Sequence, residues 1–317
     1  MKRKLAHLPL RSPISGLRLR RQRHHKSAAM TTSADLLFSL RESFYLGAYQ
    51  VAINSSDIPS LPADDALERD VIVHRSHIAL GSYKLVIDEI DSSAPTSLQA
   101  VKLLSIYLSG SKEDAISSIQ ELLSDAATCN NPVLRLIAGI IYMHERDYDE
   151  ALEHTNAGGT MELHALNVQI YITMHRLDCA EEQLKIMQQI DEDHVLTQLA
   201  NAWLDLAAGG SKIEEAYLIY QDLSEKYQMT GTILNGKAVC CMRMGRFDEA
   251  ESLLVEALNK DTKDAAALAN LAVCSLHRGK TSTTFLDQLK LLHPLYVLAR
   301  RLVAPEGNLD KALESSA

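Results

Sequence analysis

The chain has 317 residues, of which 46% are hydrophobic and 23% charged, and its formal net charge is −9. This apolar fraction excludes a disordered or collagen-like chain. The 14 Gly and 8 Pro are few, and the abundance of Ala, Leu, Glu, Gln and Lys favours helices over a β-sandwich or barrel. The strongest apolar run, Leu136–Met143, is too short to cross a membrane. We therefore expect a soluble all-α protein.

The first residues differ in composition from the rest. Residues 1–29 hold nine Lys or Arg and no acidic residue, whereas the following residues carry 23 basic and 41 acidic groups, a net charge of −18. The basic segment fits a mitochondrial transit peptide, a basic arm for nucleic acid or a membrane surface, or an upstream extension before a start at Met30. We favour the last and expect 1–29 to be a disordered extension outside the normal product. The acidic body argues against a nucleic-acid partner.

A repeat organises residues 30–295. Its clearest copy is Gly245–Ala250, in which glycine closes one helix, an aromatic residue begins the next, and a small residue three positions later lets the two helices approach closely. This is the tetratricopeptide pattern. Equivalent positions recur at separations of 34, 29, 36, 29, 36, 34 and 34 residues, and they are Tyr49, Tyr83, Lys112, Tyr148, Leu177, Ile213, Phe247 and Thr281.

The repeats predict the fold. Because a helical hairpin exposes an apolar face that it cannot bury alone, successive hairpins are expected to stack into one continuous core. We predict an all-α, tetratricopeptide-like α-solenoid of about eight helical hairpins over residues 30–295, followed by a C-terminal helical segment over 296–317. Cys240, Cys241 and Cys274 fall in the first helices of their hairpins, where we expect them to pack as small hydrophobic residues.

Two features resemble catalytic or ligand sites. Residues 231–237 fit the GxxxxGK pattern of a phosphate-binding loop, but Ala238 replaces the Ser or Thr that would hold Mg²⁺ and no strand precedes the segment. His74 and His77 are three positions apart on a predicted helix, yet no third ligand is spaced to complete a metal site. We therefore expect no enzyme activity, no cofactor and no metal.

The first helices of the hairpins are expected to line a concave face, where an extended peptide or a helix of another protein would bind. Five amide side chains could pair with the backbone of such a segment or could equally be solvated helix positions: Gln169, Gln198, Asn201, Asn235 and Asn270. These five residues do not include the full set of Lys, Asn and Arg with which chaperone-binding repeats hold a C-terminal carboxylate. This absence weighs against a co-chaperone.

Several segments resemble the epsilon subunit family of coatomer. The resemblance covers about residues 36–294 and departs from the family pattern over 296–307. It rests on Phe44–Gln50, Glu68–Asp70, Ser93–Pro95, Leu98–Val101, Asp191–Asp193, Leu196–Ala200, Ala202–Trp203, Gly209–Gly210, Leu234–Gly236, Leu286–Lys290 and His293–Pro294.

The resemblance implies a non-catalytic structural subunit of the coatomer (COPI) coat, which serves Golgi-to-ER retrograde and intra-Golgi vesicle transport. It implies that the chain binds and stabilises the C-terminal region of the alpha subunit within the heptameric coat. A small GTPase would recruit the coat, so the implied location is the cytoplasm and, peripherally, the cytosolic side of Golgi membranes and COPI-coated vesicles. The alternative is a generic tetratricopeptide adaptor, of the chaperone or ubiquitin-ligase type, that binds a peptide segment.

Overall fold

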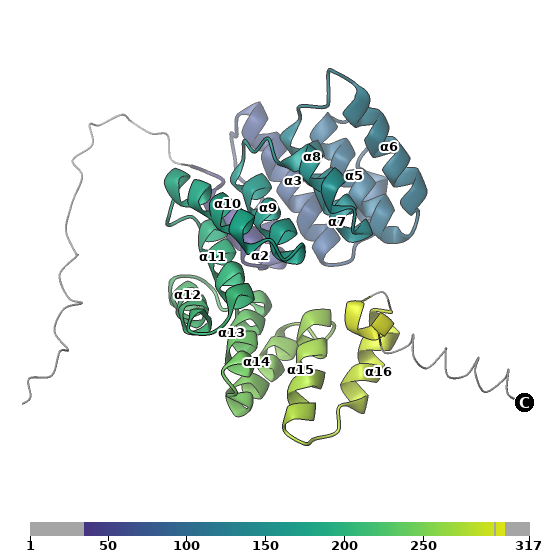
Figure 1. The fold of residues 1–317 in the computed structure, drawn as a ribbon. Helices are drawn as coiled ribbons and strands as arrows, with labels where there is room; N and C mark the ends of the chain where they lie inside the picture. The colour runs from purple at the N-terminus through teal and green to yellow at the C-terminus, as the bar shows by residue number, and fades with distance from the viewer. Residues whose placement is uncertain (1–34, 295, 302–317) are drawn as a thin grey trace, which may run out of the picture. The chain divides into compact units, whose positions relative to one another are not determined.

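The computed structural model describes residues 35–294 and 296–301. The predicted extension over 1–29, and residues 302–317 of the predicted C-terminal segment, lie outside the described residues. Within the described ranges there are sixteen helices of six residues or more and no strand (Figure 1). They are α1 (Phe38–Tyr45), α2 (Tyr49–Asn54), α3 (Ala63–Ala79), α4 (Tyr83–Glu89), α5 (Thr96–Ser109), α6 (Lys112–Ser124), α7 (Pro132–Glu145), α8 (Tyr148–Thr155), α9 (Met161–Thr173), α10 (Leu177–Ile190), α11 (Val195–Ala208), α12 (Lys212–Lys226), α13 (Gly231–Arg243), α14 (Phe247–Lys260), α15 (Ala265–His277) and α16 (Thr283–Leu292).

The helices form eight hairpins, in which the odd-numbered helix is helix A and the even-numbered helix is helix B. Each helix A packs against its own helix B and against the helix B before it. Most A helices also contact the next helix A, as α5 contacts α7 and α9 contacts α11. The A helices therefore form an inner row that the B helices cover. The predicted tetratricopeptide-like α-solenoid is confirmed, and a further helical turn over 297–301 follows α16.

The predicted positions mark the starts of the B helices. Helix α12 begins one residue before Ile213, and α16 begins at Thr283 rather than at Thr281. The Lys280 amide bonds to the Ser275 carbonyl as the corresponding amide does in earlier turns, for example Asp147 to Tyr142. In the last hairpin, however, the buried Ser282 is the residue before the helix, so the turn is longer. The other six B helices begin where predicted, at Tyr49, Tyr83, Lys112, Tyr148, Leu177 and Phe247.

A small residue lies three positions after each of the first seven predicted positions. These side chains are completely buried, because this is where helix B crosses closest to helix A and only a short side chain fits between the backbones. They are Ala52, Val86, Ala115, Ala151, Ala180, Ala216 and Ala250.

The A helices of the later hairpins begin at polar side chains that accept hydrogen bonds from the first turn. Asn131 accepts from two amides of α7, with Pro132 in the first helical position, and Asp264 does the same for α15. Thr160, His194 and Thr230 each accept one such bond, at α9, α11 and α13. Each cap satisfies amides that have no partner inside the helix, which fixes where the helix starts.

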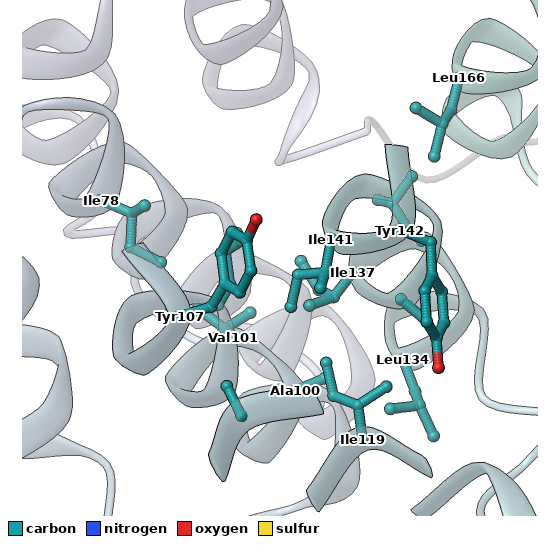
Figure 2. Close-up of a cluster of buried hydrophobic side chains, with 14 of the residues drawn as sticks. Ile78, Ala100, Val101, Tyr107, Ile119, Leu134, Ile137, Ile141, Tyr142 and Leu166 are labelled. Carbon is teal, nitrogen blue, oxygen red and sulfur yellow. The ribbon is translucent and has the colours of Figure 1, made fainter. Parts of the chain in front are cut away.

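The largest part of the core joins α3 to α9. Figure 2 shows side chains from five helices of this region converging, with Tyr107 and Ile141 facing one another between Ile78 and Leu134. Further clusters continue this core through α9 to α16. Each cluster is shared between neighbouring hairpins, which is why the stack behaves as one structure rather than as independent hairpins.

The cysteines follow the expectation for core thiols. Cys240, Cys241 and Cys274 are completely buried, and burial raises the pKa of Cys240 to about 12 and that of Cys241 to about 11. A buried thiol with a raised pKa is unreactive. The prediction that these residues act as small hydrophobic side chains is confirmed.

None of the helices in the described part of the chain is both long and apolar enough to span a bilayer.

Candidate partner-binding surface

Three of the five predicted amides occupy the same place in successive A helices. Asn201 lies in α11, Asn235 in α13 and Asn270 in α15, spaced by 34 and 35 residues. All three are half-buried. Asn270 donates a hydrogen bond from Nδ2 to Oδ1 of Asn235 over 2.9 Å. The repeat thus brings amide groups of neighbouring hairpins into contact along the inner row.

The two glutamines are placed differently. Gln198 is half-buried on the first turn of α11, and its Nε2 donates to the carbonyl of Glu192 over 2.7 Å. Its amide therefore helps to fix the loop between α10 and α11. Gln169 is half-buried on α9, and its backbone carbonyl accepts from the hydroxyl of Thr173. The structure joins neither glutamine to the asparagine pair.

The inner row is also contacted by the first hairpin. Helix α1 touches α11. Tyr45 packs against the same core cluster as Trp203, and its ring lies 5.9 Å from that of His194. The hydroxyl of Thr230 donates to the carbonyl of Leu46 over 2.6 Å, across 184 residues of sequence. Burial raises the pKa of Tyr45, as expected for a phenol held between helices.

A largely buried arginine supports the same contact. Arg75 of α3 lies 2.8 Å from Glu162 of α9, and the two side chains are only 11% and 22% exposed. Its guanidinium also lies 4.6 Å from the centre of the Phe44 ring. A carboxylate and an aromatic ring therefore both contact the guanidinium of Arg75 where little water reaches it. This ion pair is more strongly coupled than one on the surface.

Close approach at this contact explains one glycine. Gly47 has φ +82°, and a Cβ there would lie 2.3 Å from the hydroxyl oxygen of Thr232 in α13. Tyr45, Arg75 and Thr230 were not predicted from the sequence as contact residues. Repeat periodicity signals contacts between neighbours, and this contact joins hairpins that are far apart in the chain.

The segment that resembled a phosphate-binding loop is helical. Residues 231–237 form the first two turns of α13, which Thr230 caps by accepting from the amide of Ile233, so the segment is not a glycine-rich loop between a strand and a helix. Lys237 is buried, donates to Gln221 over 2.5 Å and lies 5.5 Å from the ring of Tyr217. A Cβ on Gly236 would lie 2.4 Å from the ring of Tyr220. These residues pack hairpins together.

The histidine pair is likewise embedded in helix packing. His74 lies 3.8 Å from Glu89 of the next helix, and burial lowers its pKa. His77 lies in the last turn of the same helix, α3. In the described part of the chain, no three His, Cys, Asp or Glu residues are grouped so that they could hold a metal ion.

The fold and its inner row define an α-solenoid of the tetratricopeptide class, whose members bind other polypeptides along the stacked helices. A solved tetratricopeptide repeat protein from Parabacteroides merdae ATCC 43184 has the same fold, with a TM-score of 0.57 at 14% identity, covering 85% of this chain and 98% of that one. The family model described as coatomer epsilon subunit matches residues 33–317. The chain belongs to the coatomer epsilon subunit family.

Relatives in this family are similar in sequence to this chain along nearly their whole length. Coatomer subunit epsilon-1 of Oryza sativa subsp. japonica is 70% identical over 285 residues, which cover 90% of this chain and 99% of that protein. Coatomer subunit epsilon-1 of Arabidopsis thaliana is 65% identical over 291 residues, 91% of this chain and all of that protein. The family match continues through residues 296–307, where sequence reasoning saw a departure. Family membership makes the chain a structural, non-catalytic subunit of the coatomer coat.

Proposed function

We propose that the chain binds the C-terminal region of the alpha subunit of coatomer through the inner row of its A helices and stabilises it within the heptameric coat. The observation that supports this most directly is the series of half-buried amides at Asn201, Asn235 and Asn270. Amides can donate to and accept from the backbone of a bound segment, and a stack of A helices can bury a large surface of one partner.

The proposed site of action is the cytosolic side of Golgi membranes and COPI-coated vesicles, in Golgi-to-ER retrograde and intra-Golgi transport. We propose that other coat subunits and a GTP-bound small GTPase provide the membrane attachment. The net charge of −18 over residues 30–317 supports this, because anionic lipid would repel so acidic a surface.

The test is co-expression of the full chain with the C-terminal region of the alpha subunit of the same organism, followed by size exclusion with light scattering. We expect a stable 1:1 complex. Asn201→Ala should weaken the complex about three- to tenfold, because one amide pair to the partner is lost. Asn201 is chosen because the asparagine hydrogen bond joins the other two amides.

The matched control is Asn259→Ala, at an exposed position of the outer helix α14, which should leave the complex unchanged. Two separate folded proteins in place of the 1:1 species would refute the alpha-subunit proposal. If Asn201→Ala weakens the complex no more than Asn259→Ala does, the alpha subunit remains the partner, but it binds at a surface other than the amides.

A further inference from the structure

A pocket lies between α1 and the segment that joins α12 to α13. Its volume is about 210 Å³, enough for one long side chain, and apolar groups dominate its walls. Two aromatic residues stand at it, the 55% exposed Phe38 and the half-buried Tyr227. The lining includes Phe38, Ser39, Glu42, Leu46 and Tyr227.

One of the lining side chains is a buried carboxylate. Glu42 is only 6% exposed, and within the described part of the chain no group donates a hydrogen bond to its Oε2. Burying an ionised carboxylate costs several kcal/mol unless it is paired and hydrogen-bonded. An acid placed in an apolar pocket with one oxygen unbonded is therefore suited to a cation from outside the chain.

Acidic groups outnumber basic ones around the pocket. Burial raises the pKa of Glu42 and Asp191 raises it further, while the Tyr227 hydroxyl and Arg41 oppose them. The pKa of Tyr227 rises to about 12 through burial and through Glu42, Asp193 and Asp222. The pocket thus lies in a region of negative potential.

The nearby cations are already engaged. Arg41 makes a two-point contact with Glu68, at 2.5 Å from Nε to Oε1 and 2.8 Å from Nη2 to Oε2. Lys226 lies 2.7 Å from Asp222. Neither residue is among those that line the pocket.

We propose that this pocket receives an arginine side chain from a segment of a partner protein, with its guanidinium on Glu42 and its stem between Phe38 and Leu46. Arginine suits the pocket better than lysine does, because a guanidinium is less strongly hydrated and stacks on aromatic rings. The aliphatic stem would cover the apolar wall, and the charge would complete the hydrogen bonding of the carboxylate. This inference is independent of the amides of the A helices.

The test uses the full chain labelled with 3-fluorotyrosine and two peptides, acetyl-Ala-Ala-Arg-Ala-Ala-amide and its counterpart with citrulline, the neutral analogue of arginine. The fluorine resonance of Tyr227 is assigned by its loss in Tyr227→Phe. We expect the arginine peptide to shift this resonance saturably at low ionic strength and the citrulline peptide to leave it in place.

Two variants locate the binding. Glu42→Gln keeps the shape of the side chain and should weaken peptide binding about tenfold or more, since it removes a charge-assisted hydrogen bond. Ser39→Lys, at an exposed position of the lining, should have the same effect by placing an ammonium beside Glu42, and it does so without altering the buried acid. Ser117→Lys on α6 is also exposed and changes the net charge equally, so it should bind as the parent does.

Three results would overturn the proposal. They are equal binding of the citrulline peptide, unchanged binding in both Glu42→Gln and Ser39→Lys, and the absence of any saturable shift with the arginine peptide. Sedimentation of the chain alone adds a further check. A self-association that Ser39→Lys abolishes and Ser117→Lys preserves would identify a second copy as the occupant and refute a partner segment.

Discussion

Asn270 of α15 donates a hydrogen bond from Nδ2 to Oδ1 of Asn235 in α13 over 2.9 Å. The two residues lie one repeat apart, and the bond joins the seventh and eighth A helices, which belong to adjacent hairpins. Residues at equivalent positions of two successive repeats therefore contact each other directly in the folded chain.

The asparagine pair should contribute measurably to stability. Asn235→Ala leaves the half-buried amide of Asn270 without its acceptor, and we expect the free energy of unfolding to fall by about 0.5–1.5 kcal/mol. Urea unfolding followed by circular dichroism measures this. Asn259→Ala, on the exposed side of α14, is the control, and an equal loss in both variants would contradict the pairing.

The hydroxyl of Thr230 should hold the first hairpin in place. It donates to the Leu46 carbonyl and also accepts from the amide of Ile233 at the start of α13. Thr230→Val removes both bonds at nearly constant volume and should cost about 1–3 kcal/mol.

Hydrogen exchange tests where that loss falls. We expect peptides of α1 and the start of α13 to lose protection in Thr230→Val, and peptides of α6 to keep theirs. Unchanged exchange in α1 would mean that this bond does not secure the first hairpin.

The two glycines of the GxxxxGK segment should respond differently to the same substitution. A Cβ on Gly236 would collide with the Tyr220 ring, whereas one on Gly231 would make an ordinary contact at 3.7 Å with Asp264. Gly236→Ala should therefore lower the free energy of unfolding by about 1–3 kcal/mol, and Gly231→Ala should change it by no more than about 0.5 kcal/mol. Thermal denaturation of both variants measures these two changes. If the segment bound a nucleotide instead of packing hairpins, ATP would shift the melting temperature of the parent protein.

The cap of α11 should make stability depend on pH. Nδ1 of His194 accepts from the amide of Leu196 over 3.1 Å, so this nitrogen must be unprotonated, and burial lowers the pKa of His194 below its ordinary value of 6.5. With a depressed pKa, the stabilisation is complete above the unfolded pKa and is lost as the pH falls through 6.5 toward the folded value.

Replacement by a cap that does not titrate tests this. His194→Asn keeps an acceptor at the start of α11, so its free energy of unfolding should fall less than the parent's between about pH 7 and pH 5. Some dependence should remain, because burial also lowers the pKa of His74 and His144. Identical pH profiles for parent and variant would rule out the His194 cap as a source.

Much of the fold could be predicted from the sequence because each repeat encodes contacts with its immediate neighbours. A helix end and a small residue at fixed spacing gave the starts of the B helices, and the error at α16 arose where the turn after α15 is longer. The same spacing placed Asn201, Asn235 and Asn270 in register.

The contacts of the first hairpin could not be predicted in this way. Whether Leu46 reaches Thr230 depends on the small rotation added by every intervening hairpin, and the spacing of the repeats varies between 29 and 36 residues. The pocket at Glu42 forms only where the first hairpin contacts the segment between α12 and α13, so no local sequence pattern predicts it. The burial of Glu42 in α1 can be recognised only when the positions of α12 and α13 are known.

The bond between Thr230 and Leu46 also bears on how the chain comes apart. In a linear array of repeats the terminal units fray first, because each has a neighbour on one side only. Here the first hairpin has a second set of contacts, on α11 and α13, whereas the last described hairpin, α15–α16, packs on α13 and α14. Unfolding should therefore begin at α16 and travel toward the N-terminus, and release of α1 should coincide with the global transition.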